Sequence, residues 1–177
     1  MREIIKDRAI VQDDWSILRL NEGETPEAVS VPAGKVIVPL AVWQVQRPAL
    51  LQRLQAQQEI AVWLAPDQPA ELIADDAALF PLIAIDFPKF NDGRGYSAAY
   101  LLRSRYRYSG ELRAIGDVLR DQLFYMQRVG FNAFATRADR NIQDALKGLT
   151  DFSEVYQASV DQPLPLFRRT ERQAESA

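Results

Sequence analysis

The segment DFPKFNDGRGY, which runs from Asp86 to Tyr96, holds the residues whose types and spacing are best suited to chemistry. Two glycines flank Arg94 and permit backbone conformations that other residues resist. A helix is expected to follow, and the free amides at its start favour an anion, to which Lys89 and Arg94 could add charge-assisted hydrogen bonds. The segment therefore predicts an anion site. Its candidate binding residues are Lys89, Asn91, Asp92, Gly93, Arg94, Gly95 and Tyr96.

Two later junctions between predicted strands and helices extend this candidate site. Arg120 lies one turn into a helix that begins near Asp117, and Arg137 follows the strand FNAFAT. In parallel α/β folds, ligands gather at the carboxyl ends of the strands, so neighbouring strands would bring these cations to one pocket. That pocket would hold Lys89, Arg94, Arg120 and Arg137, with Asp86 and Asp117 as polar partners.

Most of these residues also have a purely structural interpretation. Asp117 is well placed as the N-cap of the following helix, and residues 91–93 could form an ordinary turn. Tyr96 could pack in the core or at its rim. Arg94 has the least structural purpose, because it is a long cation between two glycines. In an enzyme, Asp86 or Asp117 would act as a general base and Arg94 as a clamp on the transition state.

Positive charge is concentrated in one stretch of the chain. Residues 89–140 contain ten Lys and Arg against five acids, so this window carries +5, whereas the net charge of the whole chain is −3. An uneven distribution of this kind can steer anions to one face, although salt bridges along solvated helix faces would produce the same count. A row of exposed tyrosines on a basic helix would indicate single-stranded nucleic acid. The overall negative charge disfavours nucleic acid as a partner.

Cysteine and histidine are both absent from the 177 residues. Disulfides, thiol redox couples and thiolate or imidazole metal sites are therefore excluded, and we expect neither a metal nor a cofactor. No apolar run reaches the roughly 18 residues that a membrane span needs, and no charged and then apolar leader opens the chain. We accordingly expect a cytoplasmic protein without a membrane partner.

Apolar runs and helical patterns alternate along most of the chain. Helices are expected between the strands, one with Pro48 in its first turn and one that ends at Gly130. An N-terminal hairpin over about residues 1–20 would join EIIKDRAIV to WSIL through a turn at residues 12–14. The strands are predicted at VIVPL, EIAVWLA, LIAIDF, LRAI and FNAFAT, which start near residues 36, 60, 82, 112 and 131.

This alternation predicts an α/β fold of repeated βα units with a mainly parallel sheet, preceded by the hairpin. The pattern fits an open sheet or a partial β/α barrel equally well. Nearly continuous apolar strands such as IAVWLA indicate burial on both faces of the sheet. We expect a single domain over residues 1–170 and a disordered polar tail over residues 171–177.

The block from Phe87 to Phe134 contains the motif Phe-Pro-x-Phe-x-Asp-Gly-Arg-Gly-Tyr-Ser. This block resembles bacterial domain-of-unknown-function family 934, whose members are often labelled as oxidoreductases involved in sulfite reduction. Their genes commonly neighbour the gene of the sulfite reductase hemoprotein. The resemblance implies a role in assimilatory sulfite or sulfate reduction and brings no agreed catalytic residues. Members often carry Cys where this chain has Val129, a difference that argues against a thiol-based role.

An oxidoreductase needs a cofactor or a thiol pair, and the sequence shows motifs for neither. The resemblance and the residues together favour an accessory or regulatory protein of sulfite or sulfate reduction. It would bind a small oxyanion, dock onto the sulfite reductase hemoprotein, or both, with no redox chemistry of its own. The alternative is an enzyme that acts on an anionic substrate by carboxylate and arginine chemistry. The sequence leaves the oligomeric state open.

Overall fold

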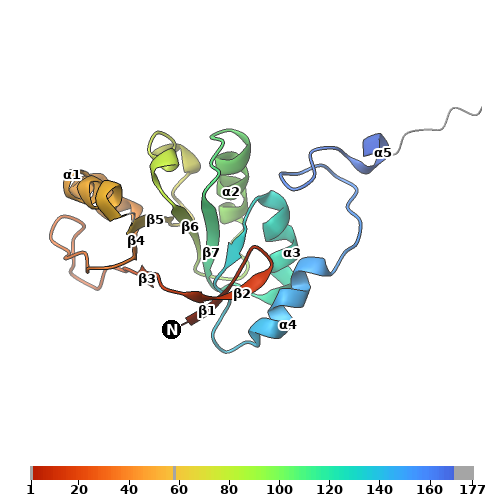
Figure 1. The fold of residues 1–177 in the computed structure, drawn as a ribbon, viewed down its shortest axis with the longest axis horizontal. Coiled ribbons are helices and arrows are strands. Elements are labelled where there is room, and N and C mark those ends of the chain that lie inside the picture. The colour runs from red at the N-terminus through yellow and green to blue at the C-terminus, as the bar shows by residue number, and fades with distance from the viewer. Residues whose placement is uncertain (1, 58, 170–177) are drawn as a thin grey trace, which may run out of the picture.

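The computed structural model of the protein describes residues 2–57 and 59–169, so the predicted tail at 171–177 lies outside the described residues. Within the described ranges, one eight-stranded sheet has the strand order β2-β1-β8-β7-β6-β5-β4-β3 (Figure 1). The strands are β1 (Arg2–Lys6), β2 (Ala9–Asp13), β3 (Ser16–Ile17), β4 (Val36–Pro39), β5 (Ile60–Leu64), β6 (Leu82–Phe87), β7 (Glu111–Gly116) and β8 (Ala133–Phe134).

Strands β3 to β8 run parallel to one another, and β1 pairs antiparallel with both β2 and β8. The predicted α/β fold with a mainly parallel sheet is thus confirmed, and the sheet curls into a half-barrel (Figure 1). The outer strands β2 and β3 are joined by only Asp14 and Trp15, so the chain passes directly from one edge of the sheet to the other. We refer to residues 9–19 as the crossing segment.

The N-terminal hairpin forms, but its turn lies at Asp7 and Arg8 rather than at residues 12–14. Both turn residues have positive φ angles, 48° and 65°, as a two-residue hairpin turn requires. Asn132 holds Asp7 in place: its side chain donates to the Asp7 carboxylate at 3.0 Å, and its carbonyl accepts the Asp7 amide at 2.8 Å. Because the hairpin is complete at Asp13, residues 16–17 pair with β4 instead.

Helix α1 begins earlier than predicted and contains Pro48 in its interior. Trp43 and Leu54, on either side of Pro48, are both buried in the core, so packing outweighs the hydrogen bond that proline removes. Each helix of the described part of the chain is too short or too polar to cross a bilayer. The helices are α1 (Leu40–Gln57), α2 (Arg94–Ser104), α3 (Arg120–Val129), α4 (Ile142–Lys147) and α5 (Leu166–Arg169), with 3₁₀ turns η1 (Ala70–Ile73), η2 (Ala77–Leu79) and η3 (Gly148–Thr150).

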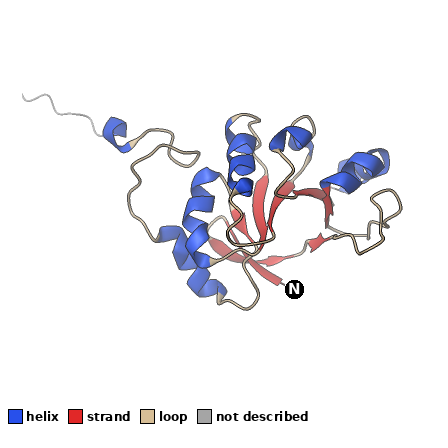
Figure 2. Ribbon diagram, turned by 180° about the vertical axis from the view of Figure 1, so that it is seen from behind, coloured by secondary structure: helices blue, strands red, loops and turns tan. Residues whose placement is uncertain are grey.

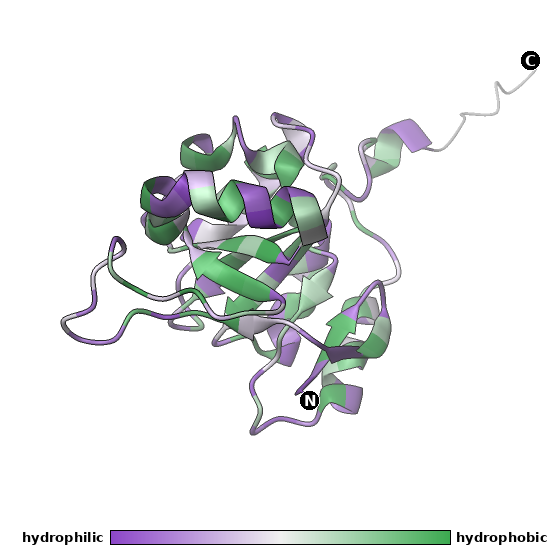
Figure 3. Cartoon of the chain, turned by 60° about the vertical axis from the view of Figure 1, so that its left-hand side comes forward, coloured by the Kyte–Doolittle hydropathy of each residue, from purple (hydrophilic) through white to green (hydrophobic). Residues whose placement is uncertain are grey.

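The two faces of the curled sheet are packed differently. Helices cover the convex face (Figure 2), where residues such as Trp43, Phe87 and Leu123 are buried in one large core. Hydrophobic strands lie in the centre of the molecule, beneath helices that alternate between hydrophilic and hydrophobic residues (Figure 3). The concave face has a smaller core to which the crossing segment contributes Val11, Trp15 and Ile17. Its fully buried members are Ile4, Ile37, Ala61, Leu82, Ala84, Ile115 and Ala135.

Helix α2 lies against β6 at a point that requires glycine. Gly95 is buried, and a Cβ atom there would come within 2.7 Å of the Phe87 ring and 2.9 Å of Ile85. Gly93 is the N-cap of α2 and has no atom within 4 Å of such a position. The two glycines that flank Arg94 therefore differ, because Gly95 serves helix–sheet packing and Gly93 faces open space.

We expect Gly95→Val to lower the free energy of unfolding by about 2 kcal/mol, because overpacking a filled core costs roughly 1–3 kcal/mol. Urea denaturation followed by circular dichroism measures this loss. Gly93→Ser is the matched control and should change the free energy of unfolding by less than about 0.5 kcal/mol, because its side chain enters open space. A Gly95 variant as stable as the wild type would show that this contact does not fix α2.

Candidate functional site

The three junctions that carry the candidate residues lie side by side at the carboxyl edge of the sheet. Strands β6, β7 and β8 are neighbours, so the loops 88–93, 117–119 and 135–141 follow one another along this edge. The strand order thus fulfils the condition under which the predicted cations could meet. The geometry of each side chain decides which of them do.

Asp117 links these three loops. Its carboxylate accepts the backbone amide of Phe90 at 3.1 Å and a hydrogen bond from Nη1 of Arg137 at 3.1 Å. The N-cap of α3 is Leu119, whose amide donates to the side chain of Gln122 at 2.9 Å. The interpretation of Asp117 as the N-cap is therefore wrong, because the helix begins three residues after it.

Arg94 is the first residue of α2, and its side chain is 62% exposed. Its guanidinium donates to Asp92 through Nε at 3.0 Å and through Nη2 at 2.7 Å. This bidentate pair lowers the pKa of Asp92 and raises the pKa of Arg94. Lys89 and Asn91 are exposed in the same loop. Arg94 is thus compensated by a neighbour two residues away.

Arg120 and Arg137 form hydrogen bonds with different carboxylates. Arg120 points toward η3 and donates to Asp151 at 2.8 Å. Arg137 makes two hydrogen bonds to Asp139, of 2.9 and 2.8 Å, in addition to its bond with Asp117. The two arginines line different cavities. The predicted cations therefore share one edge of the sheet but do not converge on one pocket, because nearby aspartates hold Arg94, Arg120 and Arg137 apart.

Tyr96 packs against other aromatic side chains. Its ring meets Phe87 edge-on with centroids 5.3 Å apart, and it lies 5.2 Å from the ring of Tyr125. Burial raises the pKa of the Tyr96 hydroxyl. These contacts favour the structural interpretation of Tyr96.

Asp86 is buried near the end of β6, and its cationic partner is Arg19. Nη2 of Arg19 donates to Oδ1 at 2.7 Å, and Nη1 donates to Oδ2 at 3.2 Å. The hydrogen bond to Asp86 raises the pKa of Arg19, and the guanidinium carbon lies 5.0 Å from the centre of the Trp63 ring. Sequence reasoning missed Arg19, because 67 residues separate it from Asp86 and no local pattern connects the two.

A cavity of about 230 Å³ lies at the carboxyl end of β8. Its charged lining residues are Arg2, Glu3, Arg137 and Arg140, and we refer to it as the arginine cavity. Arg2 reaches it from β1 and donates to the carbonyl of Thr136 at 2.6 Å. Sequence reasoning did not select Arg2, because only the antiparallel pairing of β1 with β8 brings the start of the chain to this edge.

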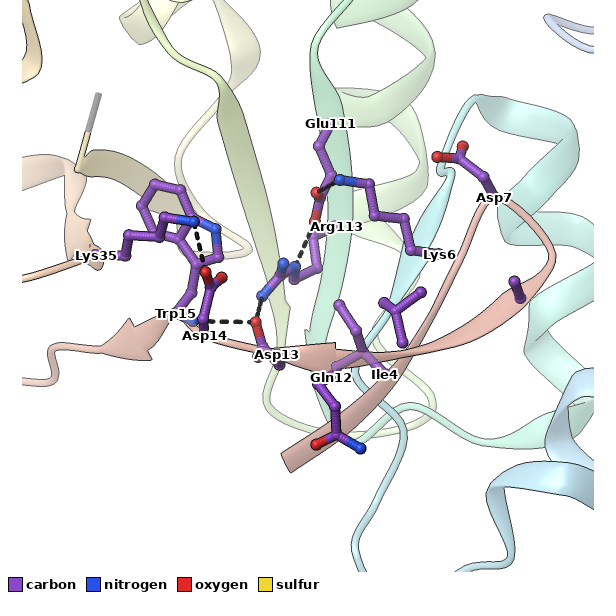
Figure 4. Close-up of a pocket in the computed structure, with 12 residues that line it drawn as sticks. Ile4, Lys6, Asp7, Gln12, Asp13, Asp14, Trp15, Lys35, Glu111 and Arg113 are labelled. Atoms are coloured by element: carbon purple, nitrogen blue, oxygen red, sulfur yellow. Dashed lines mark hydrogen bonds and ion pairs between the residues drawn. The ribbon is translucent and has the colours of Figure 1, made fainter. Parts of the chain in front are cut away.

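Another cavity, of about 510 Å³, opens on the concave face at the opposite, amino edge of the sheet (Figure 4). We refer to it as the inner cavity. Arg113 of β7 lines it with a side chain that is 2% exposed, and donates to Glu111 at 2.7 Å and to Asp13 at 2.9 Å. Lys6 pairs with the other oxygen of Glu111 at 2.7 Å. Sequence reasoning did not select these four residues, because only strand register brings them together.

Arginines, lysines and carboxylates are the chemically active groups of both cavities. Such groups recognise charged ligands through charge-assisted hydrogen bonds. Residues 2–57 and 59–169 contain no cluster of three or more His, Cys, Asp or Glu side chains arranged to hold a metal ion.

We expect Arg19→Ala to lower the free energy of unfolding by about 2 kcal/mol, because Asp86 would stay buried without its cation. Thermal or urea denaturation measures the change. Arg94→Ala is the matched control: it removes an exposed bidentate pair and should leave the unfolding transition in place. Equal losses in the two variants would contradict the assignment of Arg19 as the partner that keeps Asp86 buried.

One protein-family model matches residues 61–167, more than half of the chain, and its description is a bacterial protein of unknown function, DUF934. The matched span includes Asp86, Arg94 and Asp117, whereas Arg2 and Arg19 precede it. Comparisons with curated proteins and with solved structures gave no match. The family match confirms the resemblance carried by the glycine-flanked arginine motif, and the chain belongs to the bacterial family of unknown function DUF934.

Proposed function

We propose that this protein is an accessory or regulatory protein of sulfite or sulfate reduction, which binds a small oxyanion at the arginine cavity and has no redox chemistry of its own. The motif at residues 87–97 supports the pathway through its resemblance to a family associated with sulfite reduction. The sequence has neither Cys nor His to form a thiol couple or to ligate siroheme or an iron–sulfur cluster. The ligand class is sulfite, sulfate or phosphate, which arginine side chains bind through the same charge-assisted hydrogen bonds.

The arginine cavity is the observation that carries this proposal. Arg2, Arg137 and Arg140 line it together with Glu3. Because Arg137 is paired with Asp117 and Asp139, Arg2 and Arg140 supply the positive charge that an anion would meet. Its volume of about 230 Å³ suits a small ion. Arg140 is 62% exposed and lies 3.8 Å from Asp139, too far for a hydrogen bond, so its guanidinium is available to a ligand.

We expect sulfite and sulfate to bind the wild-type protein with measurable heat in calorimetric titration. Arg140→Ala should weaken this binding about tenfold, which corresponds to about 1.4 kcal/mol, because one charge-assisted hydrogen bond is lost. Arg94→Ala is the control and should bind as the wild type does.

Two results would count against this assignment. The absence of heat with both oxyanions would remove the oxyanion from the proposal. A loss of binding in Arg94→Ala, with none in Arg140→Ala, would move the site to the loop 88–93.

The C-terminal arm, residues 151–169, offers a surface on which the sulfite reductase hemoprotein could dock. Its middle part is held at the end of α3, where Arg128 donates to the carbonyl of Gln157 and its own carbonyl accepts the amide of Val160, and α5 at its end lies far from the sheet (Figure 1). Protein–protein contact sites commonly use large apolar side chains that the single chain leaves exposed. Its exposed large apolar side chains are Phe152 (65%), Tyr156 (67%), Leu164 (51%) and Phe167 (63%).

The tagged protein should retain the sulfite reductase hemoprotein from a lysate of its native host, and the double variant Tyr156→Ser/Phe167→Ser should lose it, because the apolar contact surface is removed. Leu72→Ser, at a 50% exposed leucine of η1, is the matched control and should retain the hemoprotein. Failure of the wild-type protein to retain the hemoprotein would exclude direct docking. Equal retention by the double variant would place the contact elsewhere.

One observation favours the second candidate function, an enzyme that uses carboxylate and arginine chemistry. Asp86 is only 6% exposed at the carboxyl end of a central parallel strand, the edge at which such folds place reacting groups. Arg19, and not Arg94, would then be the cation beside the base. Turnover of an anionic substrate that Asp86→Asn abolishes in a folded protein would decide for the enzyme over the accessory protein.

A further inference from the structure

The inner cavity lies at the amino edge of the sheet, away from the arginine cavity and unused by the proposed function. It forms where the crossing segment passes over the concave face, with Arg113 of β7 on one side and Trp15 on the other (Figure 4). At about 510 Å³ it has room for a small organic molecule.

The base of the inner cavity is a chain of paired charges. Lys6 Nζ lies 2.7 Å from one oxygen of Glu111, and Arg113 Nε donates to the other oxygen at 2.7 Å. Arg113 Nη1 continues the chain to Oδ1 of Asp13 at 2.9 Å. The side chains of Arg113, Asp13 and Glu111 are 2%, 6% and 8% exposed. Burying each ion costs several kcal/mol unless its hydrogen-bonding groups find partners.

Two polar atoms of this chain of charges have no partner in the described part of the protein and are accessible from the inner cavity. Arg113 Nη2 and Asp13 Oδ2 make no hydrogen bond to any residue that the structure describes, although both side chains are more than nine-tenths buried. Both residues line the inner cavity. Because both residues line the inner cavity and neither atom is sealed in the core, a ligand that carries an acceptor and a donor could pair with these two atoms directly.

The rim of the inner cavity adds charges of both signs and an aromatic wall. Lys35 and Asp14 form an ion pair of 2.5 Å, which lowers the pKa of Asp14, and the Lys35 ammonium lies 5.9 Å from the centre of the Trp15 ring. Ile4 and Val11 contribute apolar surface. A molecule in this cavity would therefore meet cations, carboxylates and apolar side chains together.

We infer that the inner cavity binds a small zwitterion of the α-amino acid class. An anion alone would face the four carboxylates that line the cavity, and a cation alone would face its three cationic side chains. A molecule with both charges complements both sets. Its carboxylate binds Nη2 of Arg113, its ammonium group binds Oδ2 of Asp13, and its side chain lies against Trp15 and the neighbouring apolar residues.

Calorimetric titration of the full-length protein with glycine, leucine, glutamine and phenylalanine tests this inference. At least one of the four should bind. The best binder should bind at least tenfold more tightly than its analogue without the amino group and than its analogue without the carboxylate; for leucine these are 4-methylpentanoate and isopentylamine. Absence of binding by all four, or equal binding of a singly charged analogue, overturns the proposal.

Two further measurements locate the site. Asp13→Asn keeps Oδ1 as the acceptor for Arg113 but removes the charge, so amino-acid binding should weaken at least tenfold, whereas the exposed-surface control Asp144→Asn should bind normally. Heteronuclear NMR of the wild type does not depend on the variant's folding: the indole N–H of Trp15 should shift on titration, and those of Trp43 and Trp63 should stay. Shifts confined to other parts of the protein, or normal binding by a folded Asp13→Asn variant, contradict the inference. None of these readouts depends on oxyanion binding at the opposite edge.

Discussion

The crossing segment is the constraint on which the rest of this structure depends. Residues 9–19 lead from β2 at one edge of the curled sheet to β3 at the other, across a concave face that they cover. Two arginine–carboxylate pairs fix this path: Arg113 holds Asp13, and Asp86 holds Arg19. Each pair joins the segment to a central strand: the pair of Arg113 and Asp13 lines the inner cavity, and the pair of Arg19 and Asp86 lies at the carboxyl end of β6.

The side chains of the concave core explain how closely the crossing segment can approach the sheet. Strands β5 and β6 and the residue that follows β8 each place a buried alanine there. These small residues leave room for the large rings of Trp15 and Trp63, which pack against the core. Trp63 also donates its indole N–H to the carbonyl of Leu18 at 2.9 Å. Apolar packing and hydrogen bonding therefore both hold the crossing segment against the sheet. With this segment in place, the concave face of the half-barrel is covered without closure of the sheet into a full barrel.

The parallel part of the fold could be predicted from the sequence because its signals are local. Strands β4 and β6 are apolar runs that are buried along their whole length, and Gly130 ends α3 with a φ angle of 117° at the position where a left-handed residue was expected. The pairs that fix the crossing segment left no such signal. Arg19 and Asp86 are 67 residues apart, and Asp13 and Arg113 are 100 residues apart, so their contacts depend on the register of the whole sheet.

The charge count of residues 89–140 likewise cannot show which cations are free, because ion pairs form that the count does not reveal. The excess of +5 over residues 89–140 predicts a positive field, yet Arg94 and Arg137 each bind an aspartate two residues away. These ion pairs between neighbouring residues neutralise much of the positive charge that would otherwise attract a ligand. A cation becomes available where strand pairing adds an arginine that forms no ion pair with the described residues, as β1 does by bringing Arg2 to the loop after β8. It also becomes available where a guanidinium nitrogen has no hydrogen bond to the described residues and its side chain lines a cavity, as at Arg113. Ligand recognition in this fold therefore depends on long-range strand pairing more than on the charge of any one segment.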